Sequence, residues 1–235
     1  MKNLSKTLVL LPTYNEIKNL EEIISSILHY LPSTHILVID DSSPDGTGLL
    51  ADRLSQEKPD QVFVLHRHSK EGLGRAYIAG FQWALEKDYE FIFEMDADFS
   101  HDPRYLPLLL QIAQNADLAL GSRYIEGGGV KGWAWHRRLL SLCGNFYVRS
   151  VLGMKIRDLT GGFKCFRRKV LQSLDFKTIK SNGYLFQIEM SYFSFQKGFK
   201  IEEMPIIFEE RRAGFSKMNH KIVWEALLNV WRLKK

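Results

Sequence analysis

Cysteine is scarce in this chain of 235 residues, which contains only Cys143 and Cys165. The two lie far apart and no second pair exists, so the sequence predicts neither a disulfide framework nor a zinc knuckle. Reduced thiols of this kind are typical of a cytosolic protein. Length and composition, with 45% hydrophobic and 25% charged residues, are those of one globular domain with a sizeable core.

Long hydrophobic runs are also absent. The amino terminus carries a lysine and then the apolar run 8–11, which Pro12 ends well before the length of a secretory or transmembrane segment. We find no other stretch long enough to span a bilayer. A lipid ligand would therefore require the protein to lie on the membrane surface or to bind a separate anchor.

Basic residues outnumber acidic ones and give a net charge of +5. Such an excess suits acidic ligands or an anionic surface, but many enzymes carry it without either. A nucleic-acid-binding module would need a basic face interleaved with base-stacking aromatic residues. The carboxylate-rich segments described below argue against that class, so no nucleic-acid partner is expected.

Short apolar runs alternate with amphipathic segments along the first half of the chain. The apolar runs predict strands at residues 7–11, 35–39, 61–65, 91–95 and 118–120. The segments between them predict helices at residues 48–56, 73–87 and 103–115, and a first helix, capped by Thr13 or Asn15, that reaches Leu28. This alternation predicts an α/β fold with a mostly parallel sheet, whose ligands bind beyond the carboxyl ends of the strands. The pattern loosens after Gly127, without a linker or an internal repeat.

Two carboxylates follow the fourth predicted strand. Asp96 and Asp98 stand two apart, so their side chains leave the strand on one side and can share a cation. Hard oxygen ligands of this kind suit Mg²⁺ or Mn²⁺, which keep open positions for water and a diphosphate. A lone Asp-x-Asp is commonly a solvated turn, but its position directly after the apolar run favours the metal site.

Other polar residues at strand ends allow two interpretations. Adjacent Asp40 and Asp41 point opposite ways, so one can face a ligand such as guanine while the other caps the following turn. Arg123, Arg211 and Lys217 are candidate phosphate ligands, although each taken singly is more often a solvated surface charge.

A glycine pair opens the third predicted helix without forming a dinucleotide fingerprint. Gly72 and Gly74 are followed by Tyr77 where a third glycine is required, and the preceding strand is not the first of the sheet. We therefore discount a Rossmann oxidoreductase.

Nine sequence strings, spread over nearly the whole chain, resemble the polyprenyl-phosphate (dolichyl-phosphate) mannose synthases of glycosyltransferase family 2. The strings are PTYNE at 12–16, IDDSSPDGT at 39–47, EGLGRAY at 71–77, MDADFSHDP at 95–103, GSRY at 121–124, GGVKGW at 128–133, DLTGGFK at 158–164, GYLFQIEM at 183–190 and an RxxGxSKM-like end at 211–218. Together they are highly specific.

The resemblance implies a GT-A fold and an inverting transfer of mannose from GDP-mannose to a polyprenyl or dolichyl phosphate, assisted by Mg²⁺ or Mn²⁺. Its implied donor-binding residues are Pro12, Tyr14, Glu16, Val38, Asp40, Asp96, Ala97, Asp98, Arg211 and Lys217. Its implied acceptor-binding residues are Arg123, Arg137 and Ser141. The metal ligands would be Asp96 and Asp98, and the catalytic residues would be Asp96, Asp98, Arg123 and Gln187. Gln187 and Glu189 would lie near the sugar, and the alternative is that both lie on an exposed helix face.

The sequence departs from the family pattern at two places, of which only the second leaves the exact lipid open. Ser42 replaces a common glycine or asparagine, and Leu142-Cys143-Gly144 stands where many relatives have Arg-Gly-Ala, which removes a positive charge near the acceptor. The alternatives are a family-2 transferase that uses another nucleotide sugar, such as UDP-glucose, or a non-lipid acceptor, and a nucleotide-sugar hydrolase.

The last residues suggest a way to reach a membrane. We expect a catalytic domain at 1–217 and an amphipathic interfacial helix at 218–235, because Lys221, Glu225, Asn229 and Arg232 form one narrow polar stripe. This would place the protein peripherally on the cytoplasmic face of a membrane. The alternatives are that the helix packs on the protein's own core, on a second copy or on a membrane-anchoring subunit.

Overall fold

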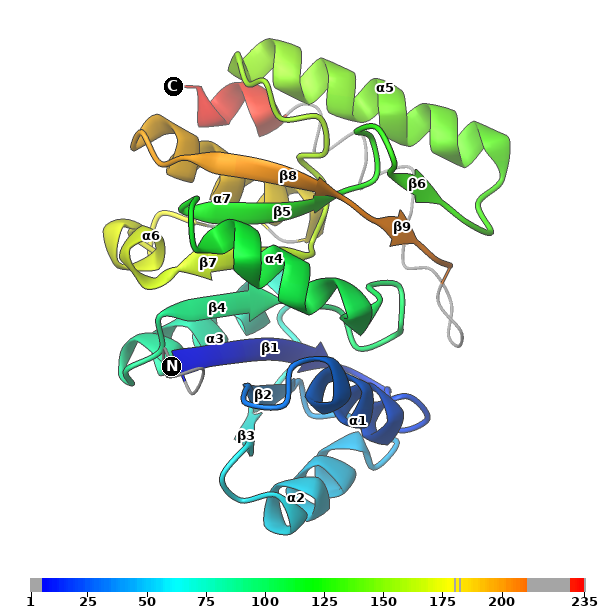
Figure 1. Ribbon diagram of the computed structural model, residues 1–235, viewed down its shortest axis with the longest axis vertical. Coiled ribbons are helices and arrows are strands. Elements are labelled where there is room, and N and C mark those ends of the chain that lie inside the picture. Colours follow the sequence, from blue (N-terminus) through cyan, green and yellow to red (C-terminus); the bar gives the residue numbers. More distant parts are fainter. Residues whose placement is uncertain (1–5, 180, 182, 211–228, 235) are drawn as a thin grey trace.

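The computed structural model describes residues 6–179, 181, 183–210 and 229–234, and it is built around one seven-stranded sheet (Figure 1). The strand order is β3-β2-β1-β4-β7-β5-β8. The strands are β1 (Thr7–Thr13), β2 (His35–Asp40), β3 (Val62–His66), β4 (Phe91–Glu94), β5 (Leu118–Ser122), β7 (Lys164–Arg167) and β8 (Ile201–Pro205). Only β7 runs against its neighbours, β4 and β5, so the prediction of a mostly parallel sheet is confirmed.

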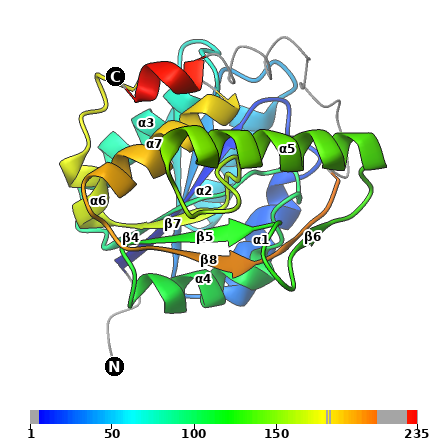
Figure 2. The same cartoon turned by 90° about the horizontal axis from the view of Figure 1, so that it is seen from above.

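Helices cover both faces of this sheet, as the view from above shows (Figure 2). Alternate side chains of β1 explain the division, because Leu8 and Leu10 point to one face and Val9 and Leu11 to the other. The first pair packs with α3 (Leu73–Leu85), α6 (Arg168–Ser173) and α7 (Gly183–Gln196). The second pair packs with α1 (Leu20–Tyr30), α2 (Thr47–Glu57) and α4 (Leu106–Ala113), which the short helix η2 (Pro103–Tyr105) precedes.

Besides the hydrophobic cores on the two faces of the sheet, a third hydrophobic cluster lies under the long helix α5 (Trp135–Leu152). This helix crosses the molecule beside β5 and β8 (Figure 2). Val148 and Leu152 of α5 pack there with Ile188 and Tyr192 of α7. Val230 joins them and is fully buried. The part of the expected carboxyl-terminal helix that is described therefore packs on the protein's own core, and the rest of 218–235 lies outside the described residues.

The expected first helix begins later than predicted. It starts at Leu20, and neither Thr13 nor Asn15 caps it. Instead, the backbone N–H of Glu16 donates to Thr47 Oγ1 (2.9 Å) and that of Ile17 to Asp45 Oδ2 (3.3 Å). The segment after β1 is thus held against the loop after β2, and that contact was not visible in a local pattern.

Two short strands, β6 (Gly129–Val130) and β9 (Ile207–Phe208), pair in parallel beyond the main sheet. They tie the glycine-rich segment after β5 to the chain that leaves β8. This pairing holds Trp133 beside Phe208, with ring centroids 5.6 Å apart. The region where the sequence pattern loosened is therefore ordered by contacts between distant segments.

Candidate active site

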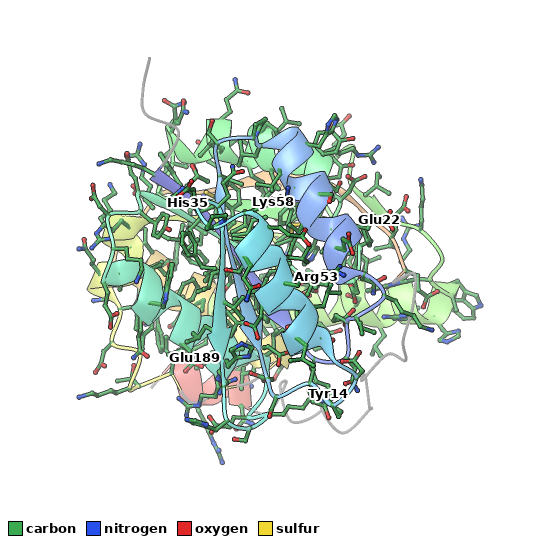
Figure 3. The ribbon with its side chains drawn as sticks, turned by 90° about the horizontal axis from the view of Figure 1, so that it is seen from below. Tyr14, Glu22, His35, Arg53, Lys58 and Glu189 are labelled. Atoms are coloured by element: carbon green, nitrogen blue, oxygen red, sulfur yellow. The ribbon has the colours of Figure 1, made fainter. Side chains whose placement is uncertain are left out.

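The loops after β1, β2 and β4 meet at one edge of the sheet, which we call the carboxylate edge and define by residues 12–16, 40–47 and 96–101. Figure 3 shows Tyr14 and Glu189 toward this end of the molecule and His35 and Lys58 toward the other. Asn15, Ser42 and Phe99 have φ values of 62°, 58° and 63°, one in each loop. Left-handed backbone at residues other than glycine costs roughly 1–2 kcal/mol each and tends to gather at functional sites.

Asp40 holds the turn after β2. Its Oδ2 accepts from the Ser43 backbone N–H (3.1 Å), and its Oδ1 accepts from the hydroxyls of Ser43 (2.5 Å) and Thr13 (3.2 Å). Neighbouring Asp41 instead forms an ion pair with Arg67 (2.5 Å). Burial raises the pKa of Asp41 although Arg67 opposes the shift. Asp40 thus fills the capping role, and one lone pair of Oδ2 is left by these contacts for a ligand.

The other residues that the resemblance assigned to the donor do not all have side chains at the carboxylate edge. Pro12, Tyr14 and Glu16 are half-buried in the loop after β1, and Lys70 Nζ lies 3.6 Å from the centre of the Tyr14 ring. Val38 lies inside the sheet, and its side chain is fully buried in the core beneath α1 and α2. The structure therefore does not bring the Val38 side chain to the carboxylate edge. Arg211 and Lys217 lie outside the described residues.

Asp96 and Asp98 stand directly after β4 in a loop with fixed geometry. Asp98 Oδ1 accepts from the Ser100 backbone N–H (3.0 Å), and the Asp96 backbone N–H donates to His101 Nδ1 (3.1 Å). The His101 proton therefore belongs on Nε2. Its ring stacks on Phe163 at 5.0 Å, and burial lowers the pKa of His101 despite both aspartates. The loop is thus braced from below by a neutral histidine.

The donor set at this edge fits a hard divalent cation. Asp98 is 6% exposed and the Asp96 side chain 33% exposed, so both carboxylates border the surface. Within the described ranges, no group of three or more His, Cys, Asp or Glu side chains is arranged to hold a metal ion. A cation bound by two carboxylates keeps coordination positions for water and phosphate oxygens, as Mg²⁺ sites at phosphates commonly do.

A layer of fully buried polar groups lies beneath the aspartates. Glu94 and Lys164 are opposite each other in the β4–β7 ladder. Lys164 Nζ donates to Gln187 Oε1 (2.6 Å) and to the Gln187 carbonyl oxygen (2.8 Å). Burial raises the pKa of Glu94 to about 7 and lowers that of Lys164 to about 8. Gln187 and Glu189 are 3% and 4% exposed, so they do not occupy an exposed helix face.

A second group of residues, the arginine cluster, comprises Arg123, Trp133, Arg137, Ser141 and Asp158. Arg123 donates from Nε and Nη2 to the two oxygens of Asp158, at 2.7 Å each. Its Nη2 also donates to Thr160 Oγ1 (2.8 Å). Burial opposes ionisation of both partners, but each charge stabilises the other, so the pKa of Arg123 is raised and that of Asp158 is lowered. The charge of Arg123 is therefore largely balanced within the fold.

Arg137 contributes the other guanidinium of this cluster. It lies 4.0 Å from the centre of the Trp133 ring, and its Nη1 donates to Glu210 Oε1 (3.0 Å). Ser141, one turn further along α5, accepts from the Tyr124 hydroxyl (2.7 Å). Arg137 Nε and Trp133 Nε1 are both buried and lack an acceptor. The oxygens of a bound anion would accept hydrogen bonds from both of these neighbouring donors.

Among the residues that the structure describes, unsatisfied buried side-chain polar atoms occur only in the buried layer beneath the aspartates and in the arginine cluster. In the described residues, the buried side-chain nitrogen and oxygen atoms without a hydrogen-bond partner belong to Glu94, Trp133, Arg137, Gln187 and Glu189. Such atoms are rare in native proteins because each costs about 1–3 kcal/mol, and a bound ligand is one common explanation. These unsatisfied atoms therefore mark the site without reference to the sequence strings that resemble the family.

Several residues that build this site carry no role that could be assigned from the sequence. Asp158 and Lys164 lie in the string DLTGGFK, and His101 lies in the string MDADFSHDP. The strings therefore contained them, but their functions depend on partners from other strands.

The family model described as "Glycosyl transferase family 2" matches residues 8–175. The chain belongs to this family. A polyprenol monophosphomannose synthase of Mycolicibacterium smegmatis is 49% identical over 226 residues, which cover 96% of this chain and 85% of that protein. An undecaprenyl-phosphate mannosyltransferase of Micrococcus luteus is 45% identical over 227 residues, covering 97% and 93%. The resemblance to polyprenyl-phosphate mannose synthases is confirmed.

Solved structures confirm the GT-A fold of this family 2 protein. Glucosyl-3-phosphoglycerate synthase of Mycobacterium tuberculosis with Mn²⁺ and UDP-glucose aligns with a TM-score of 0.67 at 19% identity, covering 99% of this chain and 80% of that one. A mannosyltransferase of Pyrobaculum calidifontis with GDP-mannose and Mn²⁺ aligns with a TM-score of 0.57 at 15% identity, covering 88% and 57%. At these identities the likeness concerns the fold alone.

Proposed function

We propose that this protein transfers mannose from GDP-mannose to a polyprenyl phosphate, giving a β-mannosyl phosphate lipid and GDP. One observation carries the proposal: the carboxylate edge presents Asp96 and Asp98, a pair that suits a divalent cation bound to a diphosphate, while the arginine cluster holds two buried donors without acceptors. Two separate anion sites are what a nucleotide-sugar donor and a phosphate acceptor require. The names of the relatives supply the sugar and the lipid.

On the donor side, the loops after β1, β2 and β4 would bind GDP-mannose. Pro12, Tyr14, Glu16 and Asp40 would contact the guanosine, and Arg211 and Lys217 would close over its phosphates. Asp96 and Asp98, with Ala97 between them, would hold Mg²⁺ or Mn²⁺. A divalent cation at these carboxylates supplies positive charge to the departing diphosphate. The Ser100 backbone N–H holds the Asp98 carboxylate, and His101 holds the backbone of Asp96.

On the acceptor side, the phosphate would accept from Arg137 Nε and Trp133 Nε1. Arg123 would border it through Nη1, which its contacts with Asp158 and Thr160 leave unused, and Ser141 would lie beside it. A phosphate monoester has its second pKa near about 6, so it is already ionised at neutral pH. A strong general base is therefore unnecessary, and the residues need only to orient two anions that repel each other.

The reaction is a single in-line displacement. A phosphate oxygen of the lipid forms a bond to the anomeric carbon while the bond from that carbon to the diphosphate breaks, and its electron pair leaves with GDP. Attack from the opposite side inverts the α configuration of the donor to β in the product. Gln187, fixed beneath the site by Lys164, would lie near the sugar.

A lipid substrate requires contact with a membrane. In the part of the chain that the structure describes, no helix is long and apolar enough to cross a bilayer. We place the protein peripherally on the cytoplasmic face of a membrane, with a membrane-anchoring subunit or a second copy as alternative means of attachment.

The test is a panel of donors and acceptors with purified protein. We expect radiolabelled mannose to pass from GDP-mannose to a short polyprenyl phosphate, and much less sugar to pass to water or an oligosaccharide. Efficient transfer from UDP-glucose, or preference for the oligosaccharide, would instead support another family-2 activity. Rapid release of free mannose would support a hydrolase.

A further inference from the structure

Helix α5 presents two different faces along its length. One carries Arg137, Ser141, Asn145 and Val148, of which Asn145 donates to Thr160 Oγ1 (3.1 Å) and Val148 is buried. Thr160 in turn accepts from Arg123. This face therefore borders the arginine cluster and the core beneath it.

The other face carries large apolar side chains in contact with solvent. Trp135 is 76% exposed, Leu139 53%, Leu142 38% and Phe146 63%. At about 100° per residue these four lie within about 60° of the helix circumference, roughly 130° from the first face. We call them the α5 stripe. Scattered single apolar residues on a surface are normal, but an ordered row of four on one helix is not.

The charges around the stripe suit an anionic surface. Residues 135–152 include His136, Arg137, Arg138 and Arg149 and contain no acidic residue. Arg149 lies 5.2 Å from the centre of the Phe146 ring, so a guanidinium flanks the stripe directly. A tryptophan beside basic side chains and leucines is typical of a helix that lies in the headgroup region of a bilayer.

The described end of the chain does not cover this stripe. Trp231 Nε1 donates to the Tyr147 hydroxyl (2.8 Å), and Val230 packs with Val148 and Val151. Tyr147, Val148 and Val151 lie on other sides of α5 than the stripe. Residues 229–234 therefore leave Trp135, Leu139, Leu142 and Phe146 to a different partner.

We propose that the α5 stripe inserts into the headgroup boundary of an anionic bilayer. This rests on the proposed function, because the same helix would then hold the lipid phosphate on one face and its membrane on the other. A polyprenyl chain could remain in the bilayer while its phosphate reached Arg137 across the width of one helix. The proposal moves the principal membrane contact from the carboxyl-terminal segment to α5.

The test compares the variant Trp135→Ser/Phe146→Ser with the control Leu49→Ser/Leu108→Ser, all in the full chain. Leu49 and Leu108 are 78% and 49% exposed but lie on α2 and α4. Co-sedimentation is measured with vesicles of phosphatidylcholine and phosphatidylglycerol, and with phosphatidylcholine alone. We expect the stripe variant to bind the mixed vesicles at least about tenfold more weakly, because two large apolar side chains no longer leave water. The control should bind as the wild type does, and binding should weaken with salt.

Two further measurements separate this proposal from the proposed function. GDP-mannose affinity and transfer to a short, water-soluble polyprenyl phosphate should be unchanged in the stripe variant, while transfer to a long-chain lipid in vesicles falls. Undiminished vesicle binding by the stripe variant would overturn the proposal. If the variant bound vesicles normally but no longer formed a dimer that the wild type forms, the stripe would instead be a contact between two copies. Failure of the wild type to use the short acceptor would refute the proposed function alone.

Discussion

The carboxylate edge and the arginine cluster bind charge in different ways. At the carboxylate edge, Asp40 bonds to a residue three positions away, Asp98 to one two away and Asp96 to one five away. In the arginine cluster, Arg123 and Asp158 are 35 positions apart, and Arg137 and Glu210 are 73 apart. Each loop of the edge is therefore shaped partly by bonds within it, although bonds such as that from the Glu16 N–H to Thr47 Oγ1 join the loops. The charged pairs of the cluster, by contrast, all join residues far apart in the sequence. Substitutions at the edge should affect chemistry, and those in the cluster should affect stability or the acceptor.

The largest effect is expected for Asp158→Asn. It leaves the buried Arg123 guanidinium without its counter-charge, which typically costs about 3–5 kcal/mol of unfolding free energy. Urea unfolding measures this, with the exposed Asp60→Asn as the control. A cost below about 1 kcal/mol, the range of surface pairs, would mean that Arg123 is not locked in the fold.

Asp98→Asn should reduce transfer by about 10²–10³-fold, because an amide is a poor ligand for a hard dication and one contact to developing charge is lost. A radiolabelled transfer assay measures the rate, and Asp88→Asn, whose side chain is 87% exposed, serves as the control. Chelation should inactivate the wild type, and Mg²⁺ or Mn²⁺ should restore it. Full activity of Asp98→Asn would refute the assignment of the metal site to this edge.

Arg137→Ala should raise the KM for a short polyprenyl phosphate by about 10–100-fold, as expected for lost hydrogen bonds between charged groups. GDP-mannose affinity, measured by calorimetry, should not change. Arg138→Ala is the matched control, since Arg138 is the exposed neighbour on the same helix. Loss of GDP-mannose binding with an unchanged acceptor KM would assign Arg137 to the carboxylate edge instead.

Glu94 predicts a pH dependence of stability beneath the carboxylate edge. Its pKa rises from 4.5 to about 7 on folding, chiefly through burial, so the folded state binds more protons than the unfolded state between these values. Stability should therefore fall as pH rises from 4.5 to about 7. Glu94→Gln should reduce this loss of unfolding free energy between the two pH values by at least about 1 kcal/mol, whereas the exposed Glu90→Gln should not change it. Parallel slopes in the two variants would show that Glu94 is ionised throughout.

The smallest effect is expected for Ser42→Gly. Ser42 has a φ of 58°, a conformation that glycine adopts without strain. We expect a gain of up to about 1 kcal/mol in thermal or urea unfolding. A loss of stability would mean that the Ser42 side chain contributes more than its backbone costs.

The same contrast explains what sequence could predict. The strands β1 to β5 and the placement of Asp96 and Asp98 followed from local apolar runs, because parallel strands buried on both faces are continuous in sequence. The antiparallel insertion of β7 between β4 and β5 was not predicted, and neither was α5, because both depend on partners far along the chain. The role of Arg123 as a phosphate ligand stays a prediction, and its pairing with Asp158 required the structure.

The roles of Arg211 and Lys217 and most of the helix expected at 218–235 remain predictions, since those residues lie outside the described ranges. Residues 229–233 are helical. Their contacts with Tyr147 and Val148 tie this end of the chain to α5, the helix that borders the arginine cluster.

The reaction product distinguishes lipid mannosylation from the alternative activities. Purified protein is incubated with GDP-mannose, Mg²⁺ or Mn²⁺ and a short polyprenyl phosphate, and the lipid product is examined by mass spectrometry and by NMR of the anomeric centre. We expect a mannosyl phosphate lipid in the β configuration, formed in equal amount with GDP. An α-linked product, or GDP released with free mannose instead of mannosylated lipid, would contradict it.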